Sequence, residues 1–182
     1  MTISLANPTA TSAPDLALVD SVHRTLRRDA LRFEAALEGP ITRRKARRLV
    51  RWYARYERFM TEHHAREDEQ LFPVLSTADP DCGDLVAEMA DEHARLEEAF
   101  AQVGRALDAL RRRNKPYDQR LARASAPKFR DVLERHLDHE EFEVLPRFTA
   151  TVAATYVARE AAVVQHMHRR NARYDRALAP AA

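Results

Sequence analysis

The sequence predicts an all-α protein, an antiparallel up-down-up-down four-helix bundle with an additional helix near its C-terminal end. Only three of the 182 residues are glycine and 45% are hydrophobic, which favours long helices around a single core. Apolar residues recur at spacings of three and four along the helical segments, as in helices with one buried face. The first two segments are also repeated in the next two, which predicts two similar helix pairs.

Residues that end helices divide the chain into these segments. The expected connections are Gly39-Pro40, Pro73 with the STADPDCG stretch after it, Asn114-Lys115-Pro116, and Pro146. Thr42 is the expected N-cap of the second helix. Pro127 leaves two alternatives for the fourth helix, which is either kinked there or begins near Ser125. We therefore expect helices over residues 15–38, 42–72, 84–113, a fourth reaching residue 145, and 151–178.

The expected domain organisation has three parts. A disordered tail covers residues 1–14, the bundle covers residues 15–146, and an extra helix with a short tail covers residues 147–182. The extra helix is expected to pack along the bundle, with homodimerisation or covering of the site entrance as alternatives. Cys82 is the only cysteine, which excludes an intrachain disulfide. The first fourteen residues lack a signal-peptide pattern, and no apolar run approaches the roughly 20 residues that cross a bilayer.

These features predict a cytoplasmic protein without a membrane partner. The net charge of +2 does not indicate a nucleic-acid partner, so none is expected.

The repeat is clearest in two short segments, HHAREDEQLFP at residues 63–73 and HLDHEEFEVLP at residues 136–146. A shift of 73 residues superposes His63 on His136 and Glu67 on Glu140. A shift of 70 residues superposes His23 on His93 in the preceding helices. The chain therefore contains two copies of a helix pair, each with one early histidine and one late HxxxE motif.

These repeated polar residues lie on the apolar faces of their helices. His63 and Glu67 continue the stripe of Tyr56, Phe59 and Met60, and the second copy has the same spacing. In an antiparallel bundle, early positions of the first and third helices share a level with late positions of the second and fourth. We therefore expect one buried layer to contain six polar side chains: His23, His63, Glu67, His93, His136 and Glu140.

Buried carboxylates need a partner, and no Lys or Arg lies on the inward stripe at this level. A metal centre would satisfy all six groups together. Imidazole and carboxylate without thiolate suit iron, manganese or zinc. If both glutamates bridge two ions, each ion has four protein bonds, an oxo or hydroxo bridge is the fifth, and one position stays open. The sequence therefore predicts a two-metal site with room for a small molecule.

These residues resemble the hemerythrin-like (HHE cation-binding) domain family, in its bacterial H-HxxxE-H-HxxxE form. The resemblance covers about residues 15–146 and implies a four-helix bundle with two oxo- or hydroxo-bridged iron ions that meet O2, hydrogen peroxide or NO. The oxygen-carrying members have a second His on the third helix, where this chain has Met89 and Glu97 at that spacing. They also use an Asp at +5 on the fourth helix, where this chain has Glu140 at +4. These departures favour redox chemistry with peroxide or NO over reversible O2 transport.

Neighbouring residues supply further candidates for ligands or for contacts to the ligands. Glu97, His64 and His139 are the additional candidates, whereas Asp68 and Glu69 are expected to face away from the metal.

The predicted function is that of a non-haem di-iron protein that reacts with peroxide, NO or O2. Catalase-like activity and NO or peroxide handling are the enzyme alternatives, and no catalytic residue is expected beyond the metal centre. The other class is an O2- or iron-sensing module without turnover. A ferritin-like oxidase is disfavoured because no His follows a Glu by three residues. Repeated consumption of peroxide would distinguish an enzyme from a sensing module.

Overall fold

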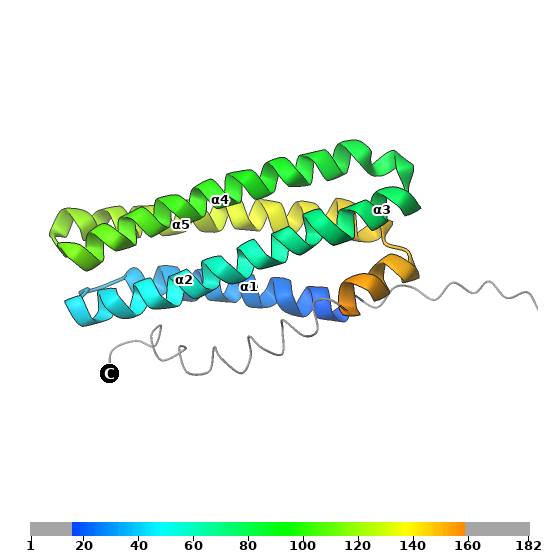
Figure 1. Cartoon of the computed structure of the whole chain (residues 1–182). Coiled ribbons are helices and arrows are strands. Elements are labelled where there is room, and N and C mark those ends of the chain that lie inside the picture. Colours follow the sequence, from blue (N-terminus) through cyan, green and yellow to red (C-terminus); the bar gives the residue numbers. More distant parts are fainter. Residues whose placement is uncertain (1–15, 159–182) are drawn as a thin grey trace, which may run out of the picture.

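The computed structural model describes residues 16–158, and over this range the chain is all-α. The long helices are α1 (Ala17–Leu37), α2 (Arg43–Arg66), α4 (Gly83–Arg112) and α5 (Pro116–His139). They run antiparallel and side by side, and a further short helix occupies residues 150–158 (Figure 1). The predicted fold class is confirmed. In the described range no helix has the length and apolar character needed to span a membrane.

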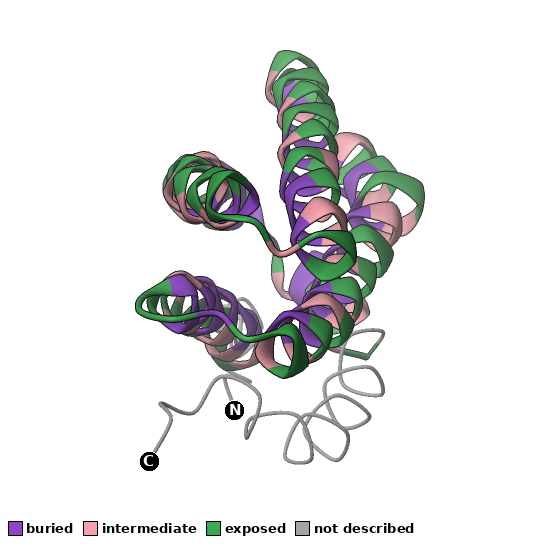
Figure 2. Cartoon of the chain, turned by 90° about the vertical axis from the view of Figure 1, so that its left-hand side faces the viewer, coloured by how far each residue is buried: buried purple, intermediate pink, exposed green. Residues whose placement is uncertain are grey.

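The helices form a ring in which α1 packs mainly against α5 and α2 against α4, with the largest contact between α4 and α5. Their buried faces point toward one another (Figure 2). Thr42 caps α2 by accepting a hydrogen bond from the backbone N–H of Lys45 at 3.2 Å, as expected from the sequence. Gly39, with φ of 65°, makes the turn between α1 and α2 in a conformation that favours glycine.

Both HxxxE motifs end in a π-helical turn. The turn η1 (Glu67–Leu71) follows α2 directly, and η3 (Glu140–Val144) follows α5. Each π turn begins at the glutamate of its motif. Single π turns inside α-helices are rare and occur frequently at functional sites. The repeat seen in the sequence is therefore also a repeat of local backbone structure.

The second helical segment extends further than the sequence predicts. We expected it to end at residue 72 because of Pro73, but α3 (Phe72–Ala78) continues it, and the turn η2 (Pro80–Cys82) follows. Pro73 lies in the first turn of α3, where a missing N–H is tolerated. Pro127 lies inside α5, which begins at Pro116 and continues through Pro127. The fourth helix therefore does not begin near Ser125.

The apolar core consists of two clusters. The body cluster fills most of the bundle and contains the large rings Phe33, Tyr53, Phe100 and Phe129. The end cluster closes the bundle beside α3 and includes Val19, Leu71, Phe72, Met89, Val144, Val152 and Tyr156.

The two clusters meet at the level of the histidines. On α1, His23 lies between Val19 of the end cluster and Leu26 of the body cluster. On α4, His93 lies between Met89 and Leu96 in the same way. The fold therefore places a polar layer between two apolar layers.

The extra helix belongs to the end cluster over the part that is described. Val152, Ala153 and Tyr156 are buried, and the ring of Phe148 lies 6.2 Å from that of Tyr156. This helix follows the turn η4 (Leu145–Arg147) and lies across the bundle end near α3 and the start of α1 (Figure 1). Residues 159–178 of the predicted helix, like residues 1–14 of the predicted tail, lie outside the described range.

Candidate metal centre

Seven buried side chains converge in the polar layer. Six are those expected from the sequence, and His64 is the seventh. None is more than 5% exposed, although all are polar or charged. They come from all four long helices and from both π turns, and they are His23, His63, His64, Glu67, His93, His136 and Glu140.

Two groups within this set have spacings that suit metal ions. In the first group, ligand atoms of His23, His63 and Glu140 all lie within 4.8 Å of one another. In the second group, atoms of His64, His93 and His136 meet the same limit. The two groups differ in composition, because the first has two imidazoles and the second has three.

The two glutamates connect these groups. Glu67 places Oε1 3.1 Å from Nε2 of His63 and Oε2 3.6 Å from Nε2 of His93. Glu140 places Oε2 3.4 Å from Nε2 of His23 and 4.0 Å from Nε2 of His136. Each carboxylate thus contacts one histidine of each group. Glu67 directs a different oxygen at each group, whereas Glu140 contacts both groups through Oε2. Both carboxylates therefore lie between the two groups.

The chemistry of the unpaired atoms fits a cation. Within residues 16–158, several buried atoms of this layer make no hydrogen bond: Nε2 of His23, His93 and His136, both ring nitrogens of His64, and both Oε atoms of Glu140. Buried polar atoms are normally paired, and a buried carboxylate without compensation is costly. Metal ions would bind these lone pairs together. The residues present therefore fit a metal centre.

The outer nitrogens of three histidines contact carboxylates. Nδ1 of His23 lies 2.8 Å from Oε1 of Glu141, and Nδ1 of His93 lies 2.9 Å from Oδ1 of Asp68. Nδ1 of His136 lies 3.2 Å from Oε2 of Glu92. A carboxylate on one ring nitrogen orients the other nitrogen toward a metal, and metal-binding histidines commonly have such a partner.

Asp68 and Glu141 hold equivalent positions in the two copies of the repeat. Each follows its motif glutamate directly, and each contacts a histidine of the other helix pair. Asp68 is exposed, but its carboxylate contacts His93 of the polar layer, which was not expected from the sequence. The shared acid after each HxxxE motif was the signal that could have revealed it.

The three additional candidates lie in different places. His64 is 4% exposed and belongs to the second group, so the structure places it among the candidate ligands. His139 is outside both groups, and its Nδ1 contacts Glu92 at 2.9 Å, the same carboxylate that contacts His136. Glu97 is exposed on α4 and belongs to neither group.

Electrostatics differ between the two groups. Burial would lower the pKa of His23, but the carboxylates of Glu140 and Glu141 outweigh it and raise the pKa to about 9. Burial would raise the pKa of Glu140, but His23 outweighs it and lowers the pKa to about 2. Burial and neighbouring imidazoles, His93 first, hold the pKa of His64 well below its usual value. A lowered pKa favours the neutral imidazole, which is the form that binds metals.

Arg27 braces the first group from outside. Its guanidinium donates to Glu134 at 2.8 Å, to Asp138 at 2.8 Å and to Glu141 at 2.6 Å. The contact with His23 lowers the pKa of Glu141 most, burial opposes it, and the contact with Arg27 adds to it, so that the pKa falls to about 2. This network ties α1 to α5 beside His23 and fixes the carboxylate that orients that ring.

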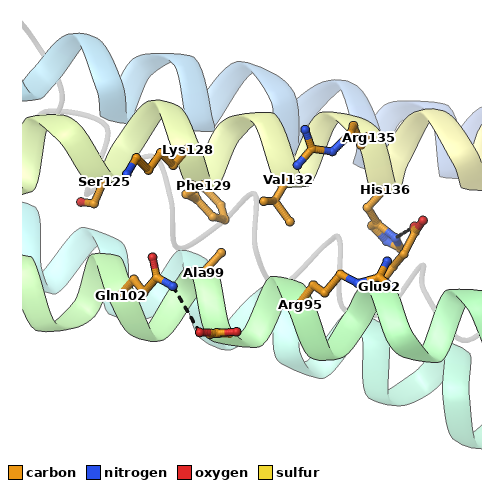
Figure 3. Close-up of a pocket in the computed structure, with 11 residues that line it drawn as sticks. Glu92, Arg95, Ala99, Gln102, Ser125, Lys128, Phe129, Val132, Arg135 and His136 are labelled. Atoms are coloured by element: carbon orange, nitrogen blue, oxygen red, sulfur yellow. Dashed lines mark hydrogen bonds and ion pairs between the residues drawn. The ribbon is translucent and has the colours of Figure 1, made fainter.

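A cleft of about 410 Å³ lies between α4 and α5 and ends at the outer side of the second group. Phe129 and Val132 point into it, and Glu92 and His136 lie at one end (Figure 3). Gln102 and Ser125 lie at the other end. The cleft therefore runs along the bundle toward His136 and Glu92, the carboxylate that contacts it.

Comparison with protein families identifies one match. Residues 15–148 match the family model described as "Hemerythrin HHE cation binding domain", which is more than half of the chain. Comparisons with curated proteins and with solved structures gave no significant match. All seven side chains of the polar layer lie within the matched range.

Proposed function

The chain belongs to the hemerythrin HHE cation-binding domain family, and from that premise we propose that its polar layer holds two iron ions. The domain is a metal-binding helical domain, and members of its family typically bind iron and small molecules such as O2. Manganese and zinc have the same preference for imidazole and carboxylate and are the alternative metals.

We assign the ligands from the two groups and the glutamates between them. His23 and His63 would hold the first ion, whereas His64, His93 and His136 would hold the second. Glu67 and Glu140 would be shared between the ions, since each contacts one histidine of each group. The first ion would then have four protein residues as ligands and the second would have five. This count leaves more positions for a small molecule at the first ion.

A bound iron pair supplies redox chemistry with hydrogen peroxide, NO or O2, and the side chains control its surroundings. The body and end clusters exclude water from both sides of the layer. Glu141, Asp68 and Glu92 keep three imidazoles in a fixed orientation. No side chain is assigned as a separate acid, base or nucleophile. The observation that carries the proposal is that each glutamate contacts one histidine of each group.

Turnover separates the two candidate functions. Iron-loaded protein is mixed with hydrogen peroxide in large excess, and peroxide consumption is followed over time. An oxidoreductase consumes many equivalents per chain, whereas a sensing or binding module stops after a stoichiometric reaction. We propose the oxidoreductase, because the first ion retains open positions beside an apolar shell. A variant with Glu97→Gln is the control, since that exposed residue lies outside both groups.

A further inference from the structure

Tyr156 brings a phenol hydroxyl to the polar layer from outside the matched family domain. The match ends at residue 148, and Tyr156 lies on the helix at residues 150–158. Its hydroxyl donates a hydrogen bond to Oε1 of Glu67, with 3.2 Å between the oxygens. Its ring lies 6.4 Å from that of His63, nearly perpendicular to it. The residue is therefore in contact with the candidate centre but is not part of its repeated frame.

The packing of the helix fixes where this hydroxyl lies. Tyr156 is 3% exposed, and Val152 and Ala153 on the same helix are also buried in the end cluster. A buried phenol needs a hydrogen-bond partner, and Glu67 provides one. The contact consequently joins the end cluster to a carboxylate at the centre of the polar layer.

The hydroxyl acts on one side of the centre. Oε1 of Glu67, which accepts the bond, is also 3.1 Å from Nε2 of His63 in the first group. The other oxygen of Glu67 faces His93 in the second group. A donor on Oε1 therefore limits rotation of the carboxylate and keeps one oxygen directed at each group.

The equivalent glutamate of the repeat has no such support. Neither oxygen of Glu140 makes a hydrogen bond in the part of the chain that is described. We propose that Tyr156 is a positioning residue of the centre, whose hydroxyl holds Glu67 in its bridging orientation on the two-imidazole side. This inference rests on the proposed two-ion centre. It implies that the extra helix contributes to metal binding as well as to closing the bundle.

The test is a metal titration of Tyr156→Phe, which removes the hydroxyl and keeps the ring. Binding of Fe²⁺ without oxygen is measured in competition with a chelator, and the thermal unfolding midpoint of the metal-free protein is measured in parallel. Loss of a residue that orients a ligand typically weakens metal affinity by about 10–100-fold, so we expect at least about tenfold weaker binding of one ion.

Two control variants separate this role from a purely structural one. Tyr53→Phe removes another buried hydroxyl, which donates to the carbonyl of Phe100 in the body cluster away from the metal layer. Tyr56→Phe likewise removes a buried hydroxyl, which donates to the carbonyl of Leu26 in the body cluster. Both controls should lower the unfolding midpoint while they retain Fe²⁺ affinity within about twofold of the wild type.

The outcomes distinguish this inference from the proposed function. Wild-type affinity for both ions in Tyr156→Phe, or equal losses in Tyr53→Phe, would overturn the positioning role and leave the two-ion centre intact. A wild-type chain that binds no Fe²⁺ would overturn the centre, and the positioning role with it.

Discussion

The two halves of the molecule, α1–α2–η1 and α4–α5–η3, have the same arrangement of polar residues, but two differences alter the surroundings of the centre. Each half has an early histidine, a late HxxxE motif, a π turn that begins at the glutamate, and an acid after it that contacts the opposite half. The first half has His64 where the second has Leu137, and Tyr156 contacts Glu67 but not Glu140. The comparison indicates that duplication provides the frame for two ions and that these two differences make the ions unequal.

Removing a bridging carboxylate should have the largest effect. Glu67→Ala and Glu140→Ala each remove contacts to histidines of both groups, so each variant should lose most of both ions. Elemental analysis of iron-loaded protein measures this directly. Glu97→Ala is the control on an exposed site. Two ions per chain in both glutamate variants would rule out the bridging assignment.

Making the two halves alike at His64 should have the next largest effect. His64→Leu copies Leu137, which is fully buried at the equivalent position, so the fold should tolerate it. The second ion would lose one of its three imidazoles and should bind at least about 100-fold more weakly, since a direct ligand is expected to matter more than the outer partners that cost about 10–100-fold. Glu97→Gln, at an exposed residue outside both groups, should bind both ions like the wild type. An unchanged titration of His64→Leu would remove His64 from the ligand set.

The outer acids should have intermediate and unequal effects. Asp68→Asn and Glu141→Gln should each weaken one ion by about tenfold. Glu141 also accepts from Arg27, so its variant should lose about 1 kcal/mol more of unfolding free energy than Asp68→Asn does. Urea denaturation of the metal-free proteins measures this difference. Equal stability of the two variants would show that the contact between Arg27 and Glu141 does not stabilise the packing of α1 against α5.

Glu97→Gln should have the smallest effect. The side chain is exposed on α4 and outside both groups, so unfolding free energy should stay within about 0.5 kcal/mol of the wild type. Iron content should also be unchanged. A clear loss of iron in this variant would mean that α4 contributes a second ligand, and the assignment of three imidazoles to the second ion would need revision.

The spacing of apolar residues in the sequence was sufficient to predict the long helices and to predict that six polar residues lie at one level of the bundle. The same residues that mark the buried faces, such as Met60 and Leu133, place His63 and His136 on those faces. Antiparallel order then brings His23 and His93 to the same level. These steps depend on local spacing and on the direction of each helix, which a sequence contains.

The rest depended on contacts between segments and on local departures from the α-helix. A regular helical wheel places His64 beside the core face, but the polar layer is broad enough to include two adjacent residues of α2. The π turns, and the continuation of the helix through Pro73 as α3, leave no mark in the spacing of apolar residues. The contacts of Asp68 and Tyr156 join residues far apart in the chain, so spacing within one helix could not reveal them.

Diffraction from crystals of iron-loaded protein, with anomalous data at the iron edge, tests the central claim most directly. The account predicts two iron peaks in the polar layer, with Glu67 and Glu140 between them. One peak should lie beside His23 and His63, and the other beside His64, His93 and His136. A single iron, or a second iron without an imidazole from His64, would contradict the proposed centre of two unequal ions.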